Sequence, residues 1–138
     1  MDSDTLNTLV SSAIWRAEQL ETHAFHSSAT AWTEVSSLEE ELAKVLPPTG
    51  PEGRIARRGA VRAALKAGDY VRAQALAEGY LSDSSSPKSL KTELRRILEA
   101  DVQAMANQFR YAARHHDLQE ARDLARRFRE AGAFGLAA

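Results

Sequence analysis

Basic side chains at regular spacing are the residues of this chain best suited to bind another molecule. They lie four residues apart, and residues four apart are stacked neighbours on one face of a helix. The members are Arg54, Arg58, Arg62 and Lys66, with a second set at Arg110 and Arg114. A guanidinium group binds a carboxylate or a phosphate through two parallel hydrogen bonds. The spacing therefore predicts a cationic ridge that binds an anion.

Patterns for catalysis or metal binding are weak by comparison. His23 and His26 are three residues apart, and the nearest further ligand candidates are Glu18 and Glu21. The chain has no cysteine, no glycine-rich phosphate loop and no nucleophile elbow. The residues at 115–117 read His-His-Asp and fall where a polar hairpin turn is expected. We therefore expect no enzymatic activity, no metal site and no cofactor.

The formal net charge of −1 conceals an acidic part and a basic part. Residues 1–52 hold nine acidic and two basic side chains, whereas residues 53–138 hold ten acidic and sixteen basic ones. Such an asymmetry favours an anionic partner for the basic part. The alternative is that the two parts face each other and neutralise. A partner would then have to displace the acidic helices from the basic surface.

Apolar periodicity predicts a helix at the start of the acidic part. Its apolar residues follow helical spacing over four turns. They are Leu6, Leu9, Val10, Ala13, Ile14, Ala17 and Leu20. Ser3 or Asp4 is expected to cap this helix. Trp15 falls on its far side, where it either anchors a partner or is covered by a neighbouring helix.

A second helical region spans 22–46 and completes an acidic helical pair, 1–46. Overlapping Ser-x-x-Glu patterns that start at Ser36 and Ser37 resemble a capping box, so the region is one bent helix or two. A proline pair ends it, because proline cannot continue the hydrogen-bond ladder. The segment 47–53 is the predicted linker to the basic part.

Four further helices are expected in the basic part, 54–138. Their approximate ranges are 54–67, 69–81, 87–115 and 118–131. No glycine or proline interrupts the third of them, although Asp101 on its apolar face calls for a buried partner or a break. Phe134 and Leu136 are candidates to dock on the last hairpin. Because no segment alternates like a strand, we predict a single all-α domain, 1–138, of about six helices.

An internal repeat relates 54–81 to 102–129 without a gap. Its identical positions are Ala56, Arg62, Ala64, Asp69, Ala73, Leu76 and Ala77, which recur as Ala104, Arg110, Ala112, Asp117, Ala121, Leu124 and Ala125. A repeat of this kind is typical of stacked helical units, which mostly present surfaces to other molecules. Gly68 permits a tight turn between two helices, and Asp69 is placed to cap the second of them.

The run Gly68-Asp69-Tyr70, followed by Ala73, Ala77 and Tyr80, resembles the turn and second helix of a tetratricopeptide repeat. The resemblance covers two units, 54–81 and 102–129, and implies two stacked helix-turn-helix hairpins. It also implies a concave groove lined by the basic residues of each first helix, where that family often holds the carboxylates of a peptide. Arg57 and Met105 stand where the family has a large aromatic residue.

These observations predict a non-enzymatic adaptor or scaffold that binds an acidic segment of another protein. The predicted contacts are Arg54, Arg58, Arg62, Lys66, Arg110, Arg114 and Trp15. One alternative is a small helical protein that places the same basic residues on nucleic-acid phosphates. The others are a structural homodimer and a solvated basic face without a ligand. We expect a cytoplasmic protein, because no signal peptide and no apolar stretch of about 20 residues is visible.

Overall fold

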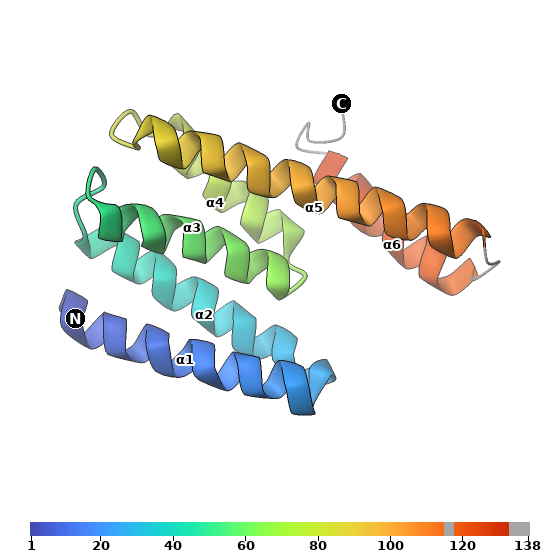
Figure 1. Ribbon diagram of the computed structural model, residues 1–138, viewed down its shortest axis with the longest axis horizontal. Coiled ribbons are helices and arrows are strands. Elements are labelled where there is room, and N and C mark those ends of the chain that lie inside the picture. The colour runs from blue at the N-terminus through green and yellow to red at the C-terminus, as the bar shows by residue number, and fades with distance from the viewer. Residues whose placement is uncertain (115–117, 133–138) are drawn as a thin grey trace. The chain divides into compact units, whose positions relative to one another are not determined.

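A computed structural model describes residues 1–114 and 118–132 of the chain (Figure 1). These residues form six α-helices and no strand, which confirms the predicted all-α fold. The helices are α1 (Ser3–His23), α2 (Phe25–Val45), α3 (Pro51–Lys66), α4 (Tyr70–Ser82), α5 (Lys88–Arg114) and α6 (Leu118–Gly132). None of the described helices is both long and apolar enough to cross a membrane. The His-His-Asp turn and the tail residues Phe134 and Leu136 lie outside the described residues.

The chain divides into two compact units, Met1–Leu94 and Arg95–Ala138. The first unit holds α1 to α4 and the first turns of α5, and the second holds the rest of α5 together with α6. The acidic helical pair, the linker and the first basic hairpin therefore all belong to the first unit. The organisation of 1–138 as a single domain stays a prediction.

In the first unit, helices that follow one another in the chain pack side by side, α1 on α2, α2 on α3 and α3 on α4 (Figure 1). Alanines without any exposed surface let these helices approach closely. They are Ala17, Ala60, Ala64, Ala73 and Ala77. Larger buried side chains fill the remaining core, among them Leu6, Val10, Trp32, Val35 and Leu42. Full burial of one such side chain stabilises the fold by about 1.5–3 kcal/mol.

The start of α1 differs from the prediction by one residue. Asp2 caps the helix instead of Ser3 or Asp4, because its carboxylate accepts a hydrogen bond from the Thr5 backbone N–H at 2.7 Å. This bond holds the pKa of Asp2 below its usual range. Leu9, predicted on the apolar face, is 39% exposed. The reason is that it lies at the edge of a stripe whose buried members are Leu6, Val10, Ala13 and Ala17.

The second helical region is one continuous helix, α2, so the two-helix alternative is wrong. Ser36 does not cap a helix there. Its hydroxyl is fully buried and donates to the Ala60 carbonyl oxygen on α3 at 2.8 Å. The linker is shorter than the predicted 47–53, because α3 begins at Pro51. Proline is favourable in the first turn of a helix, where its missing N–H would have no partner.

Gly53 is a buried contact between the start of α3 and the preceding connection. A Cβ at this position would overlap the Pro47 carbonyl oxygen, a backbone atom that cannot rotate away. We expect Gly53→Ala to lower the free energy of unfolding by about 1–2 kcal/mol. Gly79→Ala on α4, where a Cβ meets no atom within 4 Å, should instead raise it by about 0.5–1 kcal/mol. Urea unfolding of both variants tests the contact, and changes of the same sign would contradict it.

The turn between α3 and α4 has the predicted geometry. Gly68 adopts a φ of 76°, a left-handed conformation that suits glycine. Asp69 caps α4 by accepting a hydrogen bond from the Arg72 backbone N–H at 3.0 Å. Ala73 and Ala77 are fully buried behind this turn. The local predictions are confirmed, while the wider resemblance to tetratricopeptide repeats stays a prediction.

In the second unit, α5 continues without a break past Asp101, as predicted. Leu98 and Met105 of α5 and Leu124 of α6 are buried. Asp101 is half-buried, and this burial raises the pKa of its carboxyl group. No hydrogen bond or ion pair between described residues reaches it, and the helix does not break there. The described residues therefore show neither the buried partner nor the helix break that was predicted for Asp101.

Candidate functional site

The first half of the predicted ridge on α3 is engaged within the protein itself. Arg54 donates to the Ser89 hydroxyl at 3.4 Å, and Arg58 forms an ion pair with Glu93 at 3.1 Å. Both partners lie in the first turns of α5, so these arginines fasten α3 to α5 inside the first unit. The structure therefore offers Arg54 and Arg58 less to an external anion than the spacing alone predicts.

The second half of the ridge is exposed. Arg62 and Lys66 both face solvent. The Lys66 ammonium lies 4.3 Å from the centre of the buried Trp32 ring, an attractive cation–π geometry. The indole N–H of Trp32 donates to the Glu21 carboxylate at 2.7 Å. Lys66 thus helps to cover the core, whereas no hydrogen bond or ion pair between described residues engages Arg62.

A basic residue outside the predicted ridge holds the α4–α5 connection. Arg57 is 8% exposed. Its guanidinium donates to the Ser86 hydroxyl at 2.6 Å, pairs with Asp83 at 3.2 Å and lies 5.1 Å from the centre of the Tyr80 ring. Hydrogen bonds from Ser85 hold the pKa of Asp83 below its usual range, and the charge of Arg57 adds to this effect. Arg57 has a structural role that its position in the family pattern did not reveal.

The acidic and basic parts of the chain meet in only one ion pair between described residues. It joins Glu40 of α2 to Arg72 of α4 at 2.8 Å. Arg72 also donates to the Ser36 hydroxyl at 3.0 Å. Among the described residues, ion pairs between the two parts therefore neutralise only a small share of their opposite charges.

Trp15 is exposed on the outer face of α1, with 65% of its surface accessible. The alternative that a neighbouring helix covers this side chain is wrong for the described residues. Arg16, the next residue, forms an ion pair with Glu34 of α2. Trp15 remains a candidate for an apolar contact, and its large exposed area is the property that such a contact needs.

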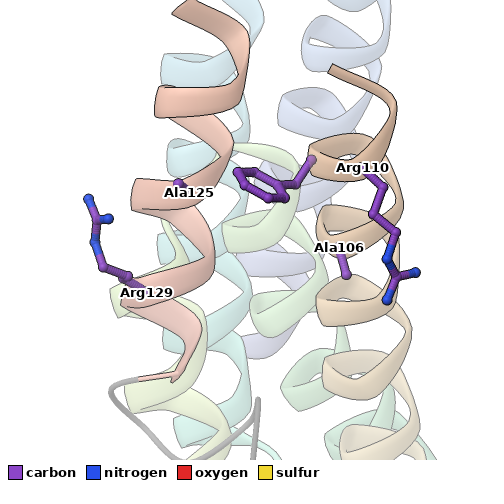
Figure 2. Close-up of a pocket in the computed structure, with 5 residues that line it drawn as sticks. Ala106, Arg110, Ala125 and Arg129 are labelled. Atoms are coloured by element: carbon purple, nitrogen blue, oxygen red, sulfur yellow. The ribbon is translucent and has the colours of Figure 1, made fainter. Parts of the chain in front are cut away.

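A pocket on the α5–α6 hairpin brings a predicted basic residue together with an apolar surface (Figure 2). Its volume is about 370 Å³. It is lined by Ala106, Phe109 and Arg110 of α5 and by Ala125 and Arg129 of α6. In Figure 2, the two alanines lie between the helices and the two arginines extend from their outer sides. We call this surface the hairpin groove.

The charges of the hairpin groove are unlike those of the α3 ridge. No acidic side chain is among the described residues that line the groove. The Arg110 guanidinium donates to the Asn107 side-chain oxygen at 3.3 Å, and none of the ion pairs between described residues includes Arg110 or Arg129. Arg114, one turn further along α5, is also exposed. The groove therefore presents cations that form no ion pair with a described carboxylate.

The spacing of basic residues predicts Arg110 in the site but does not indicate Phe109 or Arg129. Phe109 belongs to the apolar series of α5, which predicts a core position, yet it is 39% exposed. Arg129 follows Ala125 by one helical turn, in a helix where acidic and basic residues alternate. The repeat gave no signal for these two residues, because Phe109 and Arg129 align with Val61 and Leu81.

The described residues contain no group of three histidine or carboxylate side chains that could hold a metal ion. Comparisons with known proteins found no matching family model and no significant similarity to a curated protein or a solved structure.

Proposed function

We propose that the protein is a non-enzymatic interaction module and that its hairpin groove binds an acidic segment of a partner protein. The observation that carries the proposal is the combination of an apolar floor with two arginines that lack carboxylate partners in the described residues. An apolar side chain of the partner would occupy the floor, and its flanking carboxylates would pair with Arg110 and Arg129.

The size of the groove supports a peptide contact. Its volume of about 370 Å³ is near the lower end of the range for ligand sites, roughly 300–1,000 Å³. Such a volume suits one large side chain, with the remainder of the segment lying along the helices. Burial of an apolar anchor supplies affinity, whereas the arginines supply selectivity for an acidic sequence and speed up the encounter.

The proposed contacts differ from the predicted set. Arg110 and Arg114 remain, and Arg129 and Phe109 join them. Arg54 and Arg58 are no longer among the proposed contacts, because their guanidinium groups bind Ser89 and Glu93 inside the first unit. The exposed Arg62, Lys66 and Trp15 are further contacts only for a partner that also touches the first unit.

Selection from a library of random peptides tests the proposal directly. We expect enriched peptides to carry aspartate or glutamate on both sides of an aromatic residue or a leucine. Because each arginine of the groove pairs with a carboxylate, an Arg110→Glu/Arg129→Glu variant should bind these peptides at least about tenfold more weakly. Fluorescence anisotropy with a labelled peptide measures the difference.

Arg96→Glu/Arg122→Glu is the matched control. It makes the same change in net charge on the same two helices, at exposed positions that do not line the groove. Its affinity should stay within about threefold of the wild type, since a general charge effect is small at moderate salt. Equal losses in both variants, or enrichment of peptides without acidic residues, would contradict the groove. Retention of nucleic acid with a steep salt dependence would favour the phosphate-binding alternative.

A further inference from the structure

A second pocket lies in the first unit, where α1, α2 and α3 meet. Its volume is about 250 Å³. The lining residues used below are Asn7, Val10, Glu39, Leu42, Glu52 and Ile55. Apolar side chains form most of the wall, and two carboxylates and an amide add polar groups. This pocket is chemically opposite to the hairpin groove, because its charged lining groups are acidic.

Glu39 is the residue that sets this pocket apart. Glu39 is only 7% exposed. Its carboxylate takes part in no hydrogen bond or ion pair with another described residue. The carboxylate lies against Gly59 of α3, where the absence of a Cβ makes room for it. A Cβ at Gly59 would be 2.7 Å from a Glu39 oxygen. A carboxylate that is largely removed from water and has no partner is costly, so this arrangement needs an explanation.

The groups around Glu39 leave its charge largely uncompensated. Burial raises the pKa of Glu39 to about 7, and the positive charge of Arg58 on α3 opposes this shift. Arg58 itself is bonded to Glu93. Glu52 of α3, which lines the same pocket, is also acidic and supplies no positive charge. The Tyr80 hydroxyl on α4 stays protonated, because burial raises its pKa to about 12. No described cation forms an ion pair with the Glu39 carboxylate.

We propose that this pocket binds the ammonium end of an aliphatic chain, with Glu39 as its counter-ion. The alkyl part would lie against Val10, Leu42 and Ile55, with Asn7 and Glu52 beside it in the lining of the pocket. Long cationic side chains bury their methylene stems in this manner while keeping the head in polar surroundings. The volume of about 250 Å³ is below the usual range of ligand sites, roughly 300–1,000 Å³, and is sufficient for one short alkyl chain.

Two sources can supply this chemistry, a lysine side chain of a partner segment and a free alkylamine. The proposal does not depend on the hairpin groove, because the pocket lies in the other unit and has the opposite charge. A negative result for binding at one site therefore does not count against the other site.

Titration with n-butylammonium chloride, followed by amide shifts in nuclear magnetic resonance spectra, tests the pocket. We expect shifts at Val10, Leu42 and Ile55, with affinity at pH 8.5 about tenfold higher than at pH 5.5. The reason is that the ligand needs the ionised form of Glu39. The uncharged n-butanol should produce at least tenfold weaker effects. Equal shifts from both probes, or an affinity independent of pH, would overturn the proposal.

Two variants test whether the Glu39 carboxylate is responsible for the binding of n-butylammonium and for its pH dependence. Glu39→Gln keeps the shape of the side chain and should abolish the pH dependence and most of the binding. Glu41→Gln removes the same charge from α2, at an exposed residue that does not line the pocket, and should bind n-butylammonium like the wild type. Unchanged amide shifts far from the pocket establish that Glu39→Gln is folded. Binding of n-butylammonium by Glu39→Gln at wild-type strength would refute the role of Glu39.

A short peptide with one lysine distinguishes the two sources. If it binds at least tenfold more tightly than n-butylammonium, the pocket recognises a partner segment, because backbone contacts add to the affinity. If the two affinities are equal, the pocket recognises the free amine. A peptide that fails to bind while n-butylammonium binds leads to the same conclusion.

Discussion

Replacing Arg57 by alanine is expected to lower the free energy of unfolding of the first unit by about 3 kcal/mol. Most of this loss, about 2 kcal/mol, comes from the space left where the buried stem of Arg57 packed, whereas Asp83 is exposed enough for water to replace its ion pair. The buried Ser86 hydroxyl loses the bond that it accepts at 2.6 Å, which costs about 1 kcal/mol. The Tyr80 ring also loses its contact with the cation.

Arg62→Ala is the matched control for this prediction. Arg62 is on the same helix but exposed, so its removal should change the free energy of unfolding by less than about 0.5 kcal/mol. Both tryptophans, Trp15 and Trp32, lie in the first unit. Their fluorescence during urea unfolding therefore reports on that unit. Similar losses for the two variants would show that the contacts of Arg57 do not hold the α4–α5 connection.

Glu39→Gln is expected to stabilise the protein by about 2 kcal/mol at pH 8 and to have little effect at pH 4. Burial raises the pKa of Glu39 from 4.5 to about 7. Between these values the folded state keeps a proton that the unfolded state has lost, so wild-type stability falls as the pH rises. The shift would correspond to about 3 kcal/mol if it were complete, and solvent near the carboxylate reduces this.

The measurement is urea unfolding of wild type and variant at several values between pH 4 and pH 8. Their difference should grow across the interval from 4.5 to 7 and then stay constant. Glu41→Gln should show no such growth, because Glu41 is exposed and pairs with Lys44 at the surface. A constant difference between wild type and Glu39→Gln at every pH would mean that Glu39 titrates normally.

Much of the fold could be predicted because its signals are local. Helical periodicity, Gly68 and Asp69 each act within a few residues, and the structure has the helices, the turn and the cap where they indicate. Errors occur where a neighbouring element decides the outcome. Ser36 looked like a helix cap, but α3 offers it the Ala60 carbonyl oxygen. Pro51 looked like part of a linker, but it opens a helix.

The candidate site could be predicted only in part for the same reason. Spacing along one helix identifies which basic residues share a face, but not what lies opposite that face. Arg58 lies opposite Glu93, whereas Arg110 lies beside a pocket without acidic lining. Glu39 gave no signal at all, because its burial depends on Gly59 of another helix leaving space for the carboxylate.

The continuity of α5 has a consequence for anyone who wishes to study the two units as separate fragments. The boundary between Leu94 and Arg95 falls inside this helix. A cut there would deprive four carbonyl groups on one side and four N–H groups on the other of their bonds within the helix. It would also divide the row formed by the buried Leu90, Leu94 and Leu98. Each fragment would therefore need to keep several turns of the same helix, so the two pieces would have to overlap in sequence.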